Sequence, residues 1–128
     1  MAVSKPTILI VEDDSTQLAD CAAKLDALGY DVDVAMTAEE GIAVVEQKEF
    51  DLILTDNLLP GMSGLSSISE LRGRSTAPIF LMSSYATVES EKDALGLGAR
   101  AFFKKPLDFQ QVHLQFQDAL TDSKASVP

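Results

Sequence analysis

The chain has 128 residues, 46% of them hydrophobic, and these values are typical of one domain, residues 1–128, with an ordinary core. The formal net charge of −10 argues against nucleic acid as a direct partner, because the phosphate backbone would be repelled. No stretch approaches the roughly 18 uninterrupted apolar residues of a membrane helix, and residues 1–6 lack the apolar region of a secretory signal. We therefore expect a cytoplasmic protein with no membrane partner.

The first half of the chain predicts strand, helix, strand and helix in turn. Residues 7–11 form an apolar strand, and Asp14 after it suits the cap of a helix that Gly29 stops. Apolar residues recur in this helix at helical spacing: Leu18, Cys21, Leu25 and Leu28. Residues 31–35 alternate as a short strand, and residues 37–40 (TAEE) are a capping box for a second helix. We interpret the single cysteine as a small buried hydrophobe.

The second half continues the alternation. Residues 52–55 form a central strand that is too apolar to have a solvated face. Pro60 and Gly61 suit the middle of a type II turn, after which a third helix begins. Residues 79–82 are the fourth strand, and the helix from 87 to 96 is poor in apolar residues, so we expect it to be the loosest element. Alternating strands and helices predict a parallel sheet with helices on both faces.

The last strand and helix complete the predicted domain. Residues 101–103 are apolar, and Asp108 with Gln111 forms a capping box for the final helix. The apolar face of that helix consists of Phe109, Val112, Phe116 and Leu120. His113, the single histidine, is expected on its exposed face. We expect a core over about residues 6–120 and a polar tail over residues 121–128.

Polar side chains follow four of the expected strands directly. Glu12 and Asp13 follow the first strand, Asp56 follows the central one, Ser83 the fourth and Lys105 the last. In an open parallel sheet, ligands bind outside the carboxyl ends of the strands, where the strand order reverses. Acids, a hydroxyl and an ammonium at that edge suit a hard cation beside a phosphoryl group.

With these strand ends, the sequence resembles the receiver domain of two-component response regulators over about residues 6–120. The matching motifs are residues 8–14 (ILIVEDD), 51–56 (DLILTD) with 59–64 (LPGMSG), Ser83–Ser84 and Lys105–Pro106. The resemblance implies a flavodoxin-like, doubly wound α/β fold with a five-stranded parallel sheet in the order 2-1-3-4-5 and five helices. It also implies a cis peptide bond before Pro106.

The resemblance further implies a magnesium site. Asp13 and Asp56 are expected to bind Mg²⁺ directly, Glu12 through water, and Leu58 through its backbone carbonyl, with Mn²⁺ as an alternative ion. Two carboxylates about 4 Å apart repel by about 4 kcal/mol at an effective dielectric of about 20. A cation between them therefore explains why the acids are clustered.

On the same pattern, Asp56 is the phosphoacceptor, a carboxylate nucleophile that forms an acyl phosphate. Lys105 neutralises charge on the phosphoryl oxygens, and Ser83 occupies the hydroxyl position at which threonine is more usual. Phe102 matches the position of a mobile aromatic, often tyrosine. Ser83 and Phe102 are therefore the expected switch residues.

The expected function is that of a stand-alone bacterial receiver, a signalling phosphoacceptor that promotes only its own phosphorylation and dephosphorylation. Its expected partners are a sensor histidine kinase or histidine phosphotransfer protein and a downstream effector, and it is a monomer or a phosphorylation-dependent dimer. One alternative is a magnesium-dependent phosphatase of the haloacid dehalogenase type, although residues 12–14 (EDD) lack that family's Asp-x-Asp. The others are a receiver fragment of a longer regulator and an interaction module with a vestigial pocket.

Overall fold

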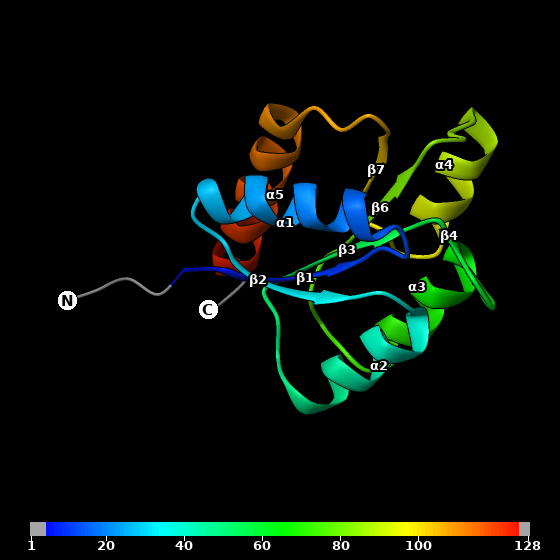
Figure 1. The fold of residues 1–128 in the computed structure, drawn as a ribbon, viewed down its shortest axis with the longest axis horizontal. Coiled ribbons are helices and arrows are strands. Elements are labelled where there is room, and N and C mark those ends of the chain that lie inside the picture. The colour runs from blue at the N-terminus through cyan, green and yellow to red at the C-terminus, as the bar shows by residue number, and fades with distance from the viewer. Residues whose placement is uncertain (1–4, 126–128) are drawn as a thin grey trace.

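The computed structural model describes residues 5–125, and within them five parallel strands form one sheet in the order β2-β1-β3-β6-β7 (Figure 1). The strands are β1 (Thr7–Val11), β2 (Asp31–Ala35), β3 (Leu52–Asp56), β6 (Ile79–Ser83) and β7 (Ala101–Lys104). The short strands β4 (Leu58–Leu59) and β5 (Met62–Ser63) form a separate antiparallel pair. The order of the main sheet is therefore the predicted 2-1-3-4-5, and the fold is flavodoxin-like and doubly wound.

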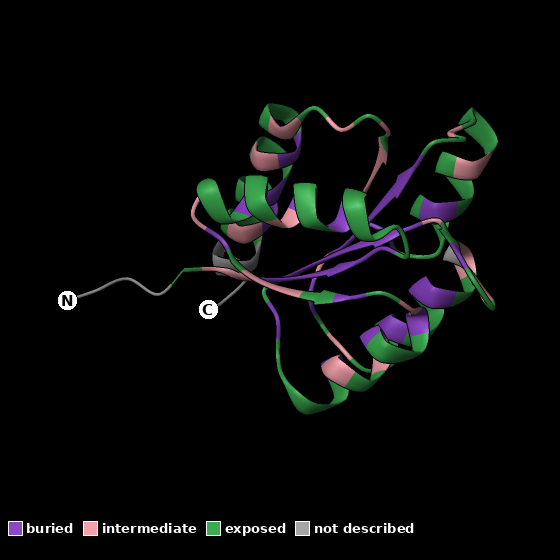
Figure 2. Cartoon of the chain, in the orientation of Figure 1, coloured by how far each residue is buried: buried purple, intermediate pink, exposed green. Residues whose placement is uncertain are grey.

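The helices cover both faces of the sheet (Figure 1). Helices α1 (Ser15–Ala27) and α5 (Phe109–Ala125) pack on one face. Helices α2 (Ala38–Gln47), α3 (Gly64–Arg72) and α4 (Val88–Gly96) pack on the other. All residues of β3 and β6 are buried, and Figure 2 shows buried strands between helices whose outer sides are exposed. Burial on both faces explains why these strands read as continuous apolar runs.

The register of the sheet brings the ends of distant strands to one edge. Val11 at the end of β1 pairs with Thr55 in β3, and Asp56 pairs with Met82 in β6. Ser83 at the end of β6 pairs with Lys104 in β7. Strand order reverses between β1 and β3, because β2 lies on the outer side of β1 and the remaining strands lie beyond β3. This edge is the switch point at which such sheets bind ligands.

The helix starts largely follow the predicted caps. The Asp14 carboxylate accepts hydrogen bonds from the backbone N–H groups of Thr16 and Gln17, both at 3.0 Å, so it caps α1. Thr37 caps α2 by accepting from Glu40 N–H at 3.0 Å. The predicted capping box is altered, because the Glu40 carboxylate accepts from the amide of Met36 at 3.4 Å.

Helix α5 extends into the segment expected to be a polar tail. It runs from Phe109 to Ala125, past Thr121, at which the polar tail is expected to begin. The remainder of that expected tail, residues 126–128, lies outside the described residues. The guanidinium of Arg100, which precedes β7, donates to Asp118 at 3.3 Å and also to Asp122. These ion pairs join the last turns of α5 to the residue that precedes β7. Local composition does not reveal such tertiary contacts.

His113 does not lie on the exposed face of α5, and that prediction is wrong. Its Nδ1 lies 2.9 Å from the hydroxyl of Tyr30, and the two rings meet edge to face with centroids 5.7 Å apart. Tyr30 is 1% exposed, so its hydroxyl needs partners inside the fold, and Gln117 supplies a second one at 3.1 Å. Cys21, in contrast, is 5% exposed in the core, as predicted.

Helix α4 is weakly anchored, as its composition predicted. Among its described residues, Ala94 is the one that is fully buried. Val88 at its start is 86% exposed, and Leu95 is 44% exposed. Within residues 5–125, no helix has the length and apolar content needed to cross a membrane.

Candidate functional site

Three carboxylates meet at the carboxyl edge of the sheet. Oxygen atoms of Glu12, Asp13 and Asp56 all lie within 4.8 Å of one another. Glu12 is 1% exposed and Asp56 is 6% exposed, whereas Asp13 faces solvent. The backbone fixes the position of Glu12, because its N–H donates to the carbonyl of Ala35 in β2 at 3.0 Å. The structure therefore brings together the three acids that the sequence predicted as a cation site.

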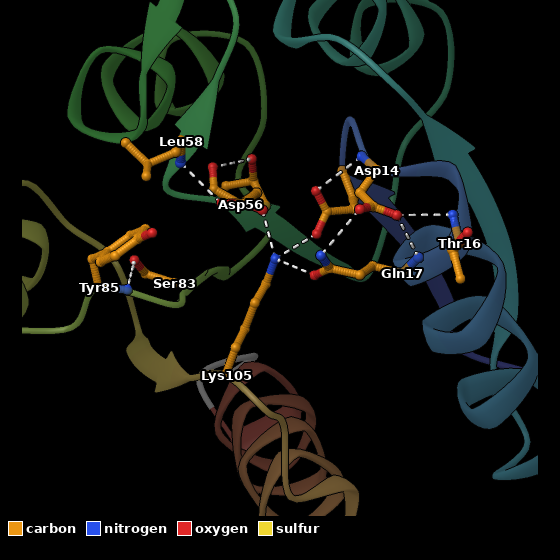
Figure 3. Close-up of polar contacts among 10 residues, drawn as sticks. Asp14, Thr16, Gln17, Asp56, Leu58, Ser83, Tyr85 and Lys105 are labelled. Carbon is orange, nitrogen blue, oxygen red and sulfur yellow. Dashed lines mark hydrogen bonds and ion pairs between the residues drawn. The ribbon is translucent and has the colours of Figure 1, made fainter.

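Lys105 projects into this acidic cluster from the end of β7 (Figure 3). Its Nζ donates to Glu12 Oε1 at 2.5 Å, to Asp56 Oδ2 at 2.6 Å and to Gln17 Oε1 at 2.7 Å. The peptide bond between Lys105 and Pro106 is cis, as the resemblance implied. The predicted ammonium is thus in direct contact with the predicted nucleophile.

Burial and neighbouring charge shift two pKa values at this edge. Burial raises the pKa of Glu12 to about 7, and the nearby Asp56 carboxylate pushes in the same direction against the opposing hydrogen bond from Lys105. Burial alone would lower the pKa of Lys105, but its hydrogen bonds to Asp56 and Glu12 outweigh burial and raise it. At neutral pH, the lysine is therefore charged, and burial opposes ionisation of Glu12.

Donors engage both carboxylate oxygens of Asp56. Oδ2 accepts from Lys105, and Oδ1 accepts from the backbone N–H of Leu58 at 2.9 Å (Figure 3). Leu58 begins the β4–β5 hairpin, so this short hairpin fixes one side of the carboxylate. These bonds define the orientation of a group that is expected to react.

Ser83 and Phe102 lie on neighbouring strands beside the site. Ser83 is fully buried at the end of β6, and its Oγ accepts from the backbone N–H of Tyr85 at 3.0 Å (Figure 3). Phe102 in β7 pairs with Leu81 of β6 and packs, half-buried, against the core on the α4 face. The two predicted switch residues therefore lie on β6 and β7, the two strands that α4 connects.

Gln17 is the site residue that the sequence did not predict. It lies in the first turn of α1, where a polar residue after a cap normally faces solvent, and it reaches Lys105 from 88 positions away in the chain. No local pattern signals such a pairing. The Leu58 amide was missed in the same way, since the sequence predicted only its carbonyl as a functional group.

A cavity of about 360 Å³ adjoins the acids between α1 and the segment that connects β7 to α5. Its lining includes Gln17, Cys21, Lys24, Lys105, Pro106 and Phe109. Gln17 and Lys105, which are in contact with each other, therefore both line this cavity.

The sequence of this chain is similar to those of known proteins. A family model described as the response regulator receiver domain matches residues 8–117. The chain is 33% identical over 125 residues to the transcriptional regulatory protein ZraR of Salmonella typhimurium. That match covers 97% of this chain and 28% of ZraR, so the chain spans little more than a quarter of that relative.

Two solved structures are similar in fold and sequence. One is a response regulator protein from Burkholderia pseudomallei with a phosphorylated aspartic acid, 25% identical, with a TM-score of 0.83 over 94% of this chain and 71% of that one. The other is the receiver domain of the sensor histidine kinase PA1611 from Pseudomonas aeruginosa, with magnesium coordinated in its active-site cleft. It is 25% identical, with a TM-score of 0.83 over 91% of this chain and 98% of that one.

Proposed function

Because the chain belongs to the response regulator receiver domain family, we propose that Asp56 accepts a phosphoryl group from the phosphohistidine of a partner protein. The single observation that carries this proposal is the position of the Asp56 carboxylate, which lies 2.6 Å from the Lys105 ammonium inside an acidic cluster. A nucleophile held between a cation site and an ammonium suits phosphoryl transfer, which depends mainly on positioning and charge neutralisation.

Glu12, Asp13 and Asp56 are the residues that would hold Mg²⁺, or Mn²⁺ in its place, with the backbone carbonyl of Leu58 as a further oxygen ligand. Carboxylate oxygens gathered within 4.8 Å fit a hard cation of this kind. The magnesium in the similar PA1611 domain supports the assignment. When bound, the ion supplies positive charge for the oxygens of the transferred group.

In the proposed step, an Asp56 carboxylate oxygen forms a bond to phosphorus. The phosphorus–nitrogen bond of the donor phosphohistidine breaks, and the imidazole leaves with the electron pair. Lys105 then exchanges part of its contact with Asp56 for a phosphoryl oxygen. The phosphorylated aspartic acid in the similar Burkholderia pseudomallei protein supports the choice of an aspartate as acceptor.

The output of the domain is assigned to a surface next to the site. We assign the Ser83 hydroxyl to donate a hydrogen bond to a phosphoryl oxygen. The Phe102 ring then turns into the space that Ser83 leaves beneath α4. The partners are then a histidine kinase or histidine phosphotransfer protein on the input side and a cytoplasmic effector on the output side. The domain acts as a monomer or as a phosphorylation-dependent dimer.

A small phosphodonor tests the proposal directly. Acetyl phosphate with Mg²⁺ should add one phosphoryl group to the chain, labile to hydroxylamine as acyl phosphates are, and intact-protein mass spectrometry detects it. Asp56→Asn keeps the shape of the side chain but loses the nucleophile, so it should stay unmodified. Modification that persists in Asp56→Asn would move the acceptor to another residue, with Asp13 the first to examine.

A turnover assay separates the receiver from the phosphatase alternative. The family match favours the receiver, which promotes only its own phosphorylation and dephosphorylation. Incubation with a generic phosphomonoester and Mg²⁺ should therefore release no inorganic phosphate beyond the buffer control. Multiple turnovers of that substrate would support a phosphatase of the haloacid dehalogenase type.

A further inference from the structure

The hydrogen bonds of Lys105 create a conflict when a cation binds. An ammonium has three N–H donors, and those of Lys105 reach Glu12, Asp56 and Gln17. The first two partners are carboxylates that we assign to the metal site, so a divalent cation competes with the ammonium for the negative charge of these two groups. The third partner is a neutral amide oxygen. It stays available to Lys105 when the carboxylates turn to a cation.

The orientation of the Gln17 amide is fixed from its other end. Gln17 Nε2 donates to Asp14 Oδ2 at 3.3 Å, while the backbone N–H of Gln17 donates to Asp14 Oδ1 at 3.0 Å. Asp14 is itself held in place as the cap of α1. The amide nitrogen therefore faces an acceptor and the amide oxygen faces the ammonium, as Figure 3 shows.

We propose that Gln17 is a positioning residue that keeps the Lys105 ammonium beside Asp56 while the carboxylates hold the cation. Lysine carries its charge on a flexible four-carbon stem, so an ammonium that loses its carboxylate partners moves toward solvent unless another acceptor holds it. Gln17 provides that acceptor 2.7 Å away, from a helix turn that its cap makes rigid. The inference rests on the proposed function, because it assumes that a divalent cation occupies the acidic cluster.

The test measures how readily Lys105 is acylated by an amine-reactive acetylating reagent, with EDTA or with Mg²⁺. Peptide mass spectrometry quantifies the modification, and the exposed neighbour Lys104 serves as the internal reference. Gln17→Met keeps an unbranched side chain of similar length and removes the acceptor. Mg²⁺ should raise labelling of Lys105 about 2- to 10-fold more in Gln17→Met than in the wild type, the range that one net hydrogen bond supports.

Asp14→Asn provides a second, independent perturbation. Asparagine caps a helix as well as aspartate does, so α1 should keep its start. Its amide oxygen has to accept from the backbone of the first turn, which leaves its NH₂ facing Gln17. The Gln17 amide should then turn and present its own NH₂ to Lys105. Asp14→Asn should therefore reproduce the effect of Gln17→Met, and the double variant should show no further increase.

Phosphorylation by acetyl phosphate, measured on unlabelled aliquots of the same proteins, separates the two hypotheses. Equal labelling of Lys105 in the wild type and Gln17→Met in the presence of Mg²⁺ overturns the role of Gln17, even if the wild type is phosphorylated on Asp56. Additive effects in the double variant overturn it as well, because they would show that Asp14 acts independently of Gln17. A wild type that neither binds Mg²⁺ nor accepts a phosphoryl group refutes the proposed function, and this inference with it.

Discussion

At the scale of single residues, Glu12 is an acid that the fold holds at a raised pKa of about 7. The folded state therefore binds the proton of Glu12 more tightly than the unfolded chain, in which the pKa is 4.5. Protonation of Glu12 stabilises the metal-free protein fully below about pH 4.5, and this contribution is lost as the pH rises to about 7.

Glu12→Gln removes that dependence, because glutamine stays neutral at every pH. Between about pH 5 and about pH 8 in EDTA, the free energy of unfolding of the wild type should fall relative to the variant by up to about 3 kcal/mol. Urea denaturation at several pH values measures the difference. Parallel pH profiles for the two proteins would show that the fold does not oppose ionisation of Glu12.

Cys21 illustrates a second effect of burial on a single residue. Burial raises the pKa of its thiol to about 12, and the side chain is 5% exposed. Because the thiolate is the reactive form, the native thiol should react with a disulfide reagent at mildly alkaline pH at least about 100-fold more slowly than in urea. Equal rates in native buffer and urea would mean that burial does not suppress formation of the Cys21 thiolate.

At the scale of secondary structure elements, we expect α4 to be the helix most easily repositioned, because Ala94 is its one buried residue within the described chain. Converting a two-state population from 1:99 to 99:1 needs about 5.5 kcal/mol, which several charge-assisted contacts at one phosphoryl group can supply. The predicted output surface therefore comprises α4, the strand around Phe102 and the start of α5.

Beryllofluoride, a phosphoryl mimic, should make this coupling visible by NMR. Backbone amide shifts should spread from Asp56 through β6 and β7 into α4. In the resting state, the Ser83 hydroxyl accepts from the N–H of Tyr85. Ser83→Ala removes the hydroxyl that we assign to donate to the phosphoryl group, so in this variant the shifts should stay within the pocket. Shifts that reach Phe102 unchanged in Ser83→Ala, or that run only along α1, would exclude this route.

The sequence predicted the helices and strands better than the side-chain contacts between them. Apolar runs located four of the main strands, and an alternating pattern located β2. Polar residues after the apolar runs located Glu12, Asp56, Ser83 and Lys105. The β4–β5 pair was missed because two-residue strands have no period to detect. The partners of Lys105 in α1 and of Arg100 in α5 depend on tertiary packing, which local sequence patterns do not contain.

At the scale of the whole molecule, the net charge of −10 includes three acids that meet at one edge of the sheet. A cation that fills this cluster relieves repulsion in the folded state alone, so it should stabilise the fold by linkage. The gain is about 2.7 kcal/mol at a Mg²⁺ concentration 100 times the dissociation constant, and thermal unfolding with and without millimolar Mg²⁺ measures it.

Two variants locate the source of that gain. Asp13→Ala removes an exposed acid of the cluster and should abolish the stabilisation by Mg²⁺. Asp26→Ala removes an exposed acid from the other end of α1 and serves as the matched control, with the full Mg²⁺ effect retained. If Mg²⁺ leaves the melting curves of all three proteins unmoved, the acidic cluster is not a metal site.

The chain order of the site has a consequence for protein synthesis. The acids of the cluster emerge early from the ribosome, whereas the ammonium that contacts them lies 93 positions after Glu12 and 49 positions after Asp56. A nascent chain that stops before β7 therefore carries the three carboxylates without their lysine. The Lys105 ammonium that we assign to phosphoryl transfer reaches Asp56 only once β7 has joined the sheet. An unfinished chain should therefore be phosphorylated poorly.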